Sequence, residues 1–595
     1  MSPKDADAMK AALIPTMEMK DLAPCDYVLE AATENLEVKR AILRDLENVV
    51  RADCLIGFAT SAIPRARIAA EALHPERCFV NHPFYPAWRS LPIEVVASGD
   101  EKLTARMLEV LRKLGKVPIM IADVPAFAAD DIFSNYICEA MRIVEDGIAT
   151  PAQVDMIVNS AIGGGGPFNV MDLTRGNVLV VHIQELMMEA AGGNPWFAPP
   201  ALLVKQGSKL WYDPKAPGDP RHTEAQARQV LDRILAVLLG RSFAVAENGV
   251  CDPSDLNWLI RMALGFNEGM LDYGHKLGAD RVAELCLAYQ KAYPNFPVPQ
   301  CIIQKKLPEY LGDVKIERDG NIGIVRVRRP EVRNALRMRT VQEIKAAMEQ
   351  LEADPAIEGV IFTSYDGALS GADVNELAAI SRREDAEEIC RKAYAVQKFI
   401  AQMKKPVVAA VDGPVMGGGA EFAMSCHARV TGPNLVLAQP EVNLGIIPGY
   451  GATQRLPRLV GFERALELLR TGRTVNAQEA CEIGWAYGKP VEDPVRAAKE
   501  LIREHLAGKV KLAPVDPAPL AVPDRIPKLD IGHRSLLIDA ILVDAVKRGV
   551  QLPLDEGLLM EAKAFADTKE TIDADIGIKN FILNGPRIPA AFMHE

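Results

Sequence analysis

Short apolar runs alternate with helical periodicity over the first 120 residues of the chain. Asn35–Val50 and Leu103–Gly115 place apolar residues at the spacing of an amphipathic helix. The remaining apolar runs have the length of strands: Cys25–Ala31, Cys54–Thr60, Cys78–Pro86, Pro92–Ser98 and Val117–Asp123. Strands and helices that alternate in this way predict a parallel sheet of the dinucleotide-binding type over residues 1–120.

A repeated helical pattern follows this region. Glu145–Asp155 and Glu247–Asn257 share the pattern E-x-G-[IV]-x-x-P-x-x-[VL]-[DN] at an offset of 102 residues. A chance match over eleven positions is the alternative, but both copies lie in helical surroundings, so duplication of a helical unit is the simpler explanation. We therefore expect an all-α duplicated domain over residues 121–306.

The second half of the chain contains its most informative stretch, Val407–Glu441. An apolar strand, Val407–Val411, precedes a glycine triplet, Gly417–Gly419, and a helix-like run over Ala420–Val430 that carries Glu421. Glycines at a helix start let unpaired N–H groups approach an anion, and two nearby carboxylates supply acid–base chemistry. Taken alone, the triplet fits a glycine-rich turn with two solvated glutamates equally well.

Neighbouring segments favour the chemical interpretation. Val360–Thr363 has the composition of a buried strand, and Ala368–Leu377 is a small-residue turn into another helix. That turn offers a second backbone N–H, at Ala372, to pair with the N–H of Gly418.

These motifs resemble the enoyl-CoA hydratase/isomerase (crotonase) superfamily over Val314–Glu595. Further matching segments are Gly323–Leu336, the glycine-punctuated loop Asn443–Gly461 and the tail Leu554–Ile582. The resemblance implies that Ala372 and Gly418 polarise the thioester carbonyl of an acyl-CoA, while Glu421 and Glu441 act on one catalytic water. It also implies that Asp373, Val374 and Asn375 line the acyl channel. Family members that only isomerise double bonds or cleave thioesters often lack one glutamate, so hydration of a 2-enoyl-CoA is the expected reaction.

The first half resembles the 3-hydroxyacyl-CoA dehydrogenase family over Ala11–Lys306. The segment around DYVLEAATENLEVK implies that Glu34 and Lys39 lie near the nicotinamide end of NAD. Ser61 matches the hydroxyl that contacts the 3-oxygen of the substrate. His82 and Glu94 match the catalytic pair in which the histidine removes the hydroxyl proton and the glutamate orients the imidazole.

Three departures from that family predict slow or no dehydrogenase turnover. The chain lacks the opening strand–GxGxxG–helix that seats the pyrophosphate, and Gly163–Gly166 does not supply it. Asp130 stands where the family has a substrate-binding asparagine, and an ionised carboxylate cannot donate a hydrogen bond. Another polar contact of the family is replaced in the segment His82-Pro83-Phe84-Tyr85-Pro86. Ala59 stands where the family has a further asparagine.

Three hypotheses stay open for the first half. In the first, it is a degenerate dehydrogenase fused to a hydratase. In the second, it is a working dehydrogenase, either because the true start lies upstream or because the shortened fold still binds NAD. In the third, it is a structural or oligomerisation module. The expected fold class is α/β multidomain: a partial Rossmann-like domain, the duplicated helical domain, and a crotonase-like ββα spiral with C-terminal helices over residues 313–595. The junction is expected near Leu307–Gly312, and Pro514–Pro527 is expected to be an extended linker.

Composition restricts the partners. The chain has 595 residues, a formal net charge of -11 and ten cysteines without metal-ligand spacing, which argues against nucleic acid and against structural zinc. No apolar run approaches a membrane span, and Met1–Leu13 lacks a secretion-signal core. We expect a cytoplasmic homo-oligomer that binds acyl-CoA and no metal. Straight, branched and aromatic enoyl-CoA chemistries share these motifs, so the acyl group stays open.

Overall fold

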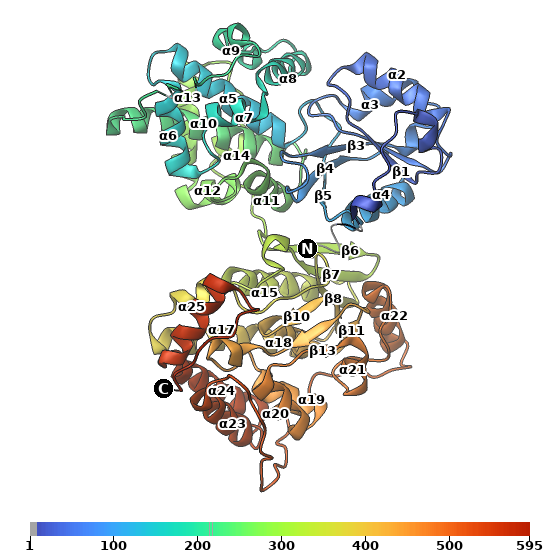
Figure 1. Ribbon diagram of the computed structural model, residues 1–595, viewed down its shortest axis with the longest axis vertical. Coiled ribbons are helices and arrows are strands. Elements are labelled where there is room, and N and C mark those ends of the chain that lie inside the picture. Colours follow the sequence, from blue (N-terminus) through green and yellow to red (C-terminus); the bar gives the residue numbers. More distant parts are fainter. Residues whose placement is uncertain (1–6, 8, 214, 217, 595) are drawn as a thin grey trace. The chain divides into compact units, whose positions relative to one another are not determined.

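The computed structural model describes residues 7, 9–213, 215–216 and 218–594. The chain divides into two compact units, Met1–Tyr310 and Leu311–Glu595, and the division falls inside the stretch expected to be the junction (Figure 1). Part of Met1–Leu13, on which the absence of a secretion signal was argued, lies outside the described residues. Within these ranges no helix combines the length and apolarity needed to cross a membrane.

The first unit begins with a five-stranded sheet in the order β1-β2-β3-β4-β5. The strands are β1 (Tyr27–Glu30), β2 (Leu55–Phe58), β3 (Cys78–Pro83), β4 (Pro92–Val96) and β5 (Val117–Met120). The predicted parallel sheet has parallel pairs β1–β2, β2–β3 and β4–β5, but β3 and β4 pair antiparallel. Residues 84–91 join them and are too few for the crossover that a parallel pair needs.

Helices of this α/β part begin where the sequence supplies capping groups. The Asn35 side chain accepts from Val38 N at the start of α2 (Leu36–Glu47), and Asp100 does the same for α4 (Glu101–Lys113). Short helical turns complete the region: η1 (Met19–Leu22), α3 (Arg65–Ile68), η2 (Ala69–Glu71) and η3 (Pro75–Arg77).

The rest of the first unit is a duplicated helical domain. The first copy comprises α5 (Ala129–Glu145), α6 (Pro151–Ile162), α7 (Pro167–Thr174), α8 (Asn177–Ala190), η4 (Pro195–Phe197) and α9 (Ala201–Gln206). The second comprises α10 (Glu224–Glu247), α11 (Pro253–Leu264), α12 (Met270–Leu277), α13 (Ala279–Ala292) and α14 (Gln300–Ile303). The acids at equivalent positions of the two copies make equivalent hydrogen bonds. Glu145 accepts from a backbone N–H in the first turn of α9, and Glu247 accepts from two backbone N–H groups in the first turn of α14. The repeat in the sequence is therefore a repeat in structure.

The second unit is built on a sheet in the order β11-β9-β8-β7-β6. Its strands are β6 (Val314–Asp319), β7 (Ile322–Val327), β8 (Gly359–Ser364), β9 (Val407–Val411) and β11 (Ala428–Thr431), parallel except for the β6–β7 hairpin. A smaller sheet, β10 (Pro414–Met416), β12 (Val436–Ala438) and β13 (Val475–Asn476), forms a second layer of the spiral (Figure 1).

Helices surround both sheets of this unit. They are η5 (Pro330–Val332), α15 (Met338–Ala353), α16 (Val374–Ala379), α17 (Arg383–Gln402), α18 (Gly418–Ser425), η6 (Glu441–Leu444), α19 (Ala452–Val460), α20 (Phe462–Thr471), α21 (Ala477–Glu482) and α22 (Pro494–Leu506). The C-terminal helices are α23 (Leu536–Gly549), α24 (Leu554–Lys569) and α25 (Ile572–Asn584).

Two local expectations for the second unit, one for a helix and one for a linker, can be compared with the structure. The helix expected over Ala420–Val430 ends at Ser425, because Ala428–Thr431 pairs with β9 and extends the sheet. The proline-rich stretch Pro514–Pro527 has no regular structure, as expected, but it is docked: Leu520 N donates to the Val550 carbonyl.

Candidate functional site

Two backbone N–H groups converge beside the start of α18. A Cβ built on Gly418 would lie 3.4 Å from Ala372 N, so the two amides are neighbours. Neither N–H donates to any acceptor in the described part of the chain. A side chain at Gly419 would meet the Leu369 carbonyl at 2.2 Å, which is why the loop and the helix start can approach so closely. The pair can therefore hold an oxygen on which negative charge develops.

Glu421 lies one turn into α18 and is 1% exposed. Its Oε1 accepts from the backbone N–H groups of Tyr450, at 2.9 Å, and Ala452, at 2.7 Å. Burial and the neighbouring carboxylates Glu441 and Glu561 raise the pKa of Glu421, while the two amide donors oppose that rise. The amides hold the carboxylate in one orientation and favour its charged form.

Glu441 begins η6 and lies against the glycine turn. A Cβ on Gly417 would come within 2.4 Å of Glu441 Oε1. The second oxygen, Oε2, is buried and has no hydrogen-bond partner among the described residues. Burial raises the pKa of Glu441 to about 8. A buried carboxyl with a raised pKa and an unpartnered oxygen is suited to exchange a proton with a ligand.

A further carboxylate, the buried Glu561 on α24, was missed by the sequence analysis. It is fully buried and accepts from Gly451 N at 2.6 Å, from Thr453 N at 2.9 Å and from the Tyr394 hydroxyl at 2.8 Å. The available signal was an acid on the apolar face of a helix, between the buried residues Leu558 and Phe565.

The predicted acyl-channel residues lie directly after Ala372. The Asp373 side chain caps α16 by accepting from Asn375 N, and its Oδ2 pairs with Arg329 at 3.0 Å. Val374 opens the helix and Asn375 is exposed. Asp373 is thus engaged in holding the turn that presents Ala372 N, while the other two lie on the same turn.

The first unit brings together His82, Glu94 and Ser61. His82 and Glu94 are direct partners in the antiparallel register of β3 and β4, and Nδ1 lies 2.7 Å from Glu94 Oε2. Ser61 Oγ lies 3.3 Å from Nε2. The other oxygen of Glu94 accepts from Ala128 N and Ala129 N, so the glutamate is fixed at both ends.

Asp130 lies on the opposite side of the imidazole. Its Oδ2 is 3.5 Å from His82 Nε2, and both side chains are largely buried. Burial lowers the pKa of His82, but Asp130 and Glu94 outweigh it and raise the pKa to about 9. Burial raises the pKa of Asp130 to about 6. Near neutral pH the histidine is therefore an imidazolium between two carboxylates, with no lone pair left to accept a proton.

The two residues predicted to contact NAD are engaged by protein groups. Lys39 is fully buried, and its ammonium donates to Glu30 at 2.7 Å and to the Ala59 carbonyl at 3.2 Å. Glu34 Oε1 accepts from the Thr60 hydroxyl and from Ser61 N and Ala62 N. This geometry gives no support to a contact between Lys39 and a cofactor, because a buried, paired ammonium cannot reach a ligand.

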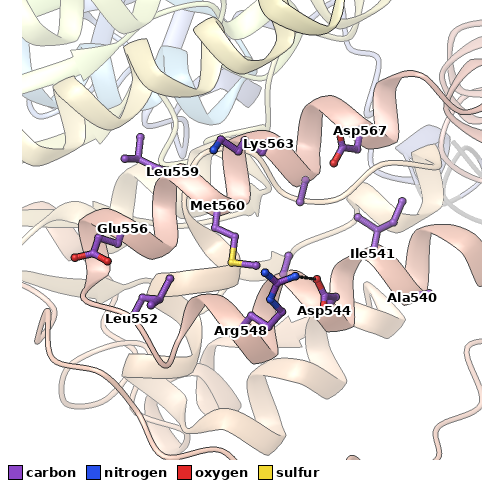
Figure 2. Close-up of a pocket in the computed structure, with 12 residues that line it drawn as sticks. Ala540, Ile541, Asp544, Arg548, Leu552, Glu556, Leu559, Met560, Lys563 and Asp567 are labelled. Carbon is purple, nitrogen blue, oxygen red and sulfur yellow. Dashed lines mark hydrogen bonds and ion pairs between the residues drawn. The ribbon is translucent and has the colours of Figure 1, made fainter.

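A surface groove of about 710 Å³ lies elsewhere in the second unit, between α23 and α24 (Figure 2). Ile541, Leu552, Leu559 and Met560 form much of its lining, and Arg548 pairs with Asp544 at 3.0 Å inside it. Glu421, Glu441 and Glu561 are not among its lining residues. The groove is distinct from the Glu421–Glu441 site.

The geometry of this site is the kind that acid–base chemistry at a carbonyl group requires. Residues 317–516 match the family described as enoyl-CoA hydratase/isomerase. Residues 1–124 match the NAD binding domain of 3-hydroxyacyl-CoA dehydrogenase, and residues 127–214, the first helical copy, match its C-terminal domain.

Two relatives agree with the enoyl-CoA hydratase/isomerase match. The chain is 34% identical over 276 residues to a short-chain-enoyl-CoA hydratase of Clostridium acetobutylicum, covering 46% of this chain and 95% of that one. It is 35% identical over 274 residues to a crotonyl-CoA hydratase of Syntrophomonas wolfei, covering 45% and 95%. A solved 3-hydroxybutyryl-CoA dehydrogenase from Escherichia coli is 20% identical with a TM-score of 0.46, covering 52% of this chain and 86% of that one. The chain belongs to the enoyl-CoA hydratase/isomerase family, and its first unit is of the 3-hydroxyacyl-CoA dehydrogenase type.

Proposed function

We propose that this protein is an enoyl-CoA hydratase that adds water across the double bond of a 2-enoyl-CoA, in the metabolism of fatty or related acids. One observation carries the proposal: the buried carboxylate Glu421 and the half-buried carboxylate Glu441, whose Oε2 is buried, lie beside the unpaired N–H groups of Ala372 and Gly418. Hydration needs both parts, an acid–base pair for the water and donors for the thioester oxygen.

The N–H pair acts on the carbonyl. As the water oxygen bonds to C3, the C2–C3 π electrons move toward the thioester and negative charge builds on its oxygen. Ala372 N–H and Gly418 N–H stabilise this enolate-like state, and removing one such donor typically costs about 3 kcal/mol. The N-terminal end of α18 adds its partial positive charge at the same point.

The glutamates divide the proton transfers. Burial raises the pKa of Glu421, and the two amide donors oppose that rise; in its ionised form Glu421 accepts a proton from the attacking water. Glu441, with its pKa raised to about 8, is protonated near neutral pH and delivers its proton to C2. The O–C3 and C2–H bonds form as the π bond breaks, and the pair returns to its first state when the proton taken from water passes to Glu441.

The test is the substitution Glu421→Gln, which keeps the shape of the side chain and removes its basic oxygen. We expect hydration of crotonyl-CoA to fall by at least about 100-fold, with little change in crotonyl-CoA binding. Loss of enoyl absorbance measures the rate, and calorimetry measures the binding. Glu463→Gln, on the exposed side of α20, is the matched control. A near-parental rate in the Glu421 variant would contradict the assignment.

A second activity is a candidate for the first unit: NAD-dependent oxidation of a 3-hydroxyacyl-CoA. The His82–Glu94 pair and Ser61 favour it, because their spacing suits removal of a hydroxyl proton. When bound, NAD would accept the hydride from C3. Asp130 opposes the activity by holding His82 in its charged form, so we expect slow turnover or none.

The remaining assignments follow from this function. We propose domains over residues 1–120, 121–306 and 313–595, acyl-CoA as the small-molecule partner, a homo-oligomeric state and a cytoplasmic location. Native mass measurement tests the oligomeric state, and limited proteolysis near Leu307–Gly312 tests the proposed junction.

A further inference from the structure

The loop Gly449–Thr453 lies between two buried carboxylates from distant parts of the second unit. Its N–H groups alternate: those of Tyr450 and Ala452 donate to Glu421, and those of Gly451 and Thr453 donate to Glu561. Gly451 makes this alternation possible, because it has a φ of +109° and a Cβ there would lie 1.8 Å from Arg455 Nη1.

Glu561 is itself held firmly on its other sides. The Tyr394 hydroxyl of α17 donates to Oε1, and the Thr453 hydroxyl donates to Oε2 at 2.5 Å. Arg455 Nη1 donates to the Tyr450 carbonyl at 3.1 Å, which fixes the same loop from its acceptor side. A displacement of Glu561 would therefore free two N–H groups and let the loop turn.

We propose that Glu561 is a positioning residue for the hydration reaction, acting through the loop Gly449–Thr453 to orient the Glu421 carboxylate. The inference rests on the proposed hydratase function. The C-terminal helix α24 thereby takes part in building the catalytic site.

The Glu561 carboxyl also acts electrostatically on the catalytic pair: burial raises its pKa, while its hydrogen-bond donors and Arg455 oppose that rise and favour its charged form. The titratable and charged groups that interact with it are Tyr394 and Cys390 from α17, Glu421 from α18, Glu441 from η6, and Arg455 from α19. Its carboxylate helps to raise the pKa values of both Glu421 and Glu441. A residue needed only for folding would not alter the pH at which the catalytic pair titrates.

Three variants separate these effects. Glu561→Gln removes the negative charge and places amide N–H donors opposite the N–H and O–H donors of the loop and of Tyr394. We expect a kcat about 10- to 100-fold lower than in the parent, with KM for crotonyl-CoA within about threefold of the parental value. We also expect the pH profile of kcat to be displaced to lower pH. Glu561→Asp keeps the charge but shortens the side chain, so kcat falls without that displacement. Thr453→Val removes one hydroxyl donor and leaves the carboxylate, with a loss of about 3- to 10-fold. Glu556→Gln, exposed on the same helix, is the control and should match the parent.

Hydrogen exchange supplies a readout that needs no activity. In Glu561→Gln, the amides of Gly451 and Thr453 should exchange at least about tenfold faster than in the parent, while those of α20 are unchanged. If the parent does not hydrate crotonyl-CoA, the proposed function fails, and faster exchange would still establish the loop contact. If Glu561→Gln does not fold, Thr453→Val and Glu561→Asp decide. A kcat within about twofold of the parent, or a loss with neither displaced pH profile nor faster exchange, would overturn the proposal.

Discussion

Glu441→Gln should make the second unit more stable and inactive at the same time. Burial raises the pKa of Glu441 from 4.5 to about 8, so the folded protein keeps a proton that the unfolded chain loses. Between those pH values unfolding releases a proton, and the free energy of unfolding therefore falls as the pH rises. Glutamine has no proton to lose, so the variant lacks this part of the pH dependence.

The expected size follows from the two pKa values. Each tenfold change in proton affinity corresponds to about 1.4 kcal/mol, so the difference between 4.5 and about 8 is worth at most about 5 kcal/mol above pH 8. The advantage of the variant is absent below about pH 4 and grows through the neutral range. Hydration of crotonyl-CoA should fall by at least about 100-fold, since no acid is left to protonate C2.

The measurement is hydrogen exchange of the central strands β8 and β9 at about pH 5, 7 and 9, because these strands report opening of the second unit. The gap between variant and parent should widen with pH, while the control Glu463→Gln keeps the parental curve. Identical pH dependence in variant and parent would refute the buried, protonated state of Glu441. A near-parental hydration rate would refute its catalytic role.

Two further substitutions test the N–H pair and the first unit. Gly418→Ala places a methyl group 3.0 Å from the Tyr450 ring and 3.4 Å from Ala372 N. The kcat for crotonyl-CoA should therefore fall about 100-fold in a folded protein. An unchanged kcat would contradict the assignment of Gly418 to the site. Asp130→Asn removes the carboxylate beside His82 Nε2, which raises the pKa of that imidazole, so the pKa of His82 measured by NMR should be lower in the variant than in the parent. NADH formation from 3-hydroxybutyryl-CoA should rise at least about tenfold, and a robust parental rate would contradict this reasoning.

Local pattern was sufficient for much of the second unit. The strand Val407–Val411 and the glycine triplet are close in sequence, and the turn before Leu377 is a short motif of its own on the other side of α17. The fold brings Ala372 next to Gly418, one turn before Glu421. Spacing alone could not reveal Glu561, because it reaches the loop from a helix more than a hundred residues further along the chain. Its signal was an acid on an apolar helix face, which local pattern cannot distinguish from a satisfied structural charge.

The first unit shows where local pattern misleads. The run Pro92–Val96 has the composition of any strand, and only the shortness of its connection to β3 indicates an antiparallel pair. The resemblance implies that Lys39 lies near the cofactor, yet the fold buries its ammonium against Glu30. Burial of an ion pair depends on which elements pack over it, and single-residue chemistry does not contain that information.

The two candidate sites differ in whether a reactive atom is left without a partner. In the second unit, amide donors saturate one oxygen of Glu421, while Glu441 Oε2 and two N–H groups have no partner among the described residues. In the first unit, Glu94, Ser61 and Asp130 surround both imidazole nitrogens of His82. A base must have a free lone pair, so the Asp130 carboxylate suffices to oppose proton removal even though the His82–Glu94 geometry is intact. Asp130→Asn changes that carboxylate alone, and it therefore distinguishes a site opposed by one residue from a site that has lost its chemistry.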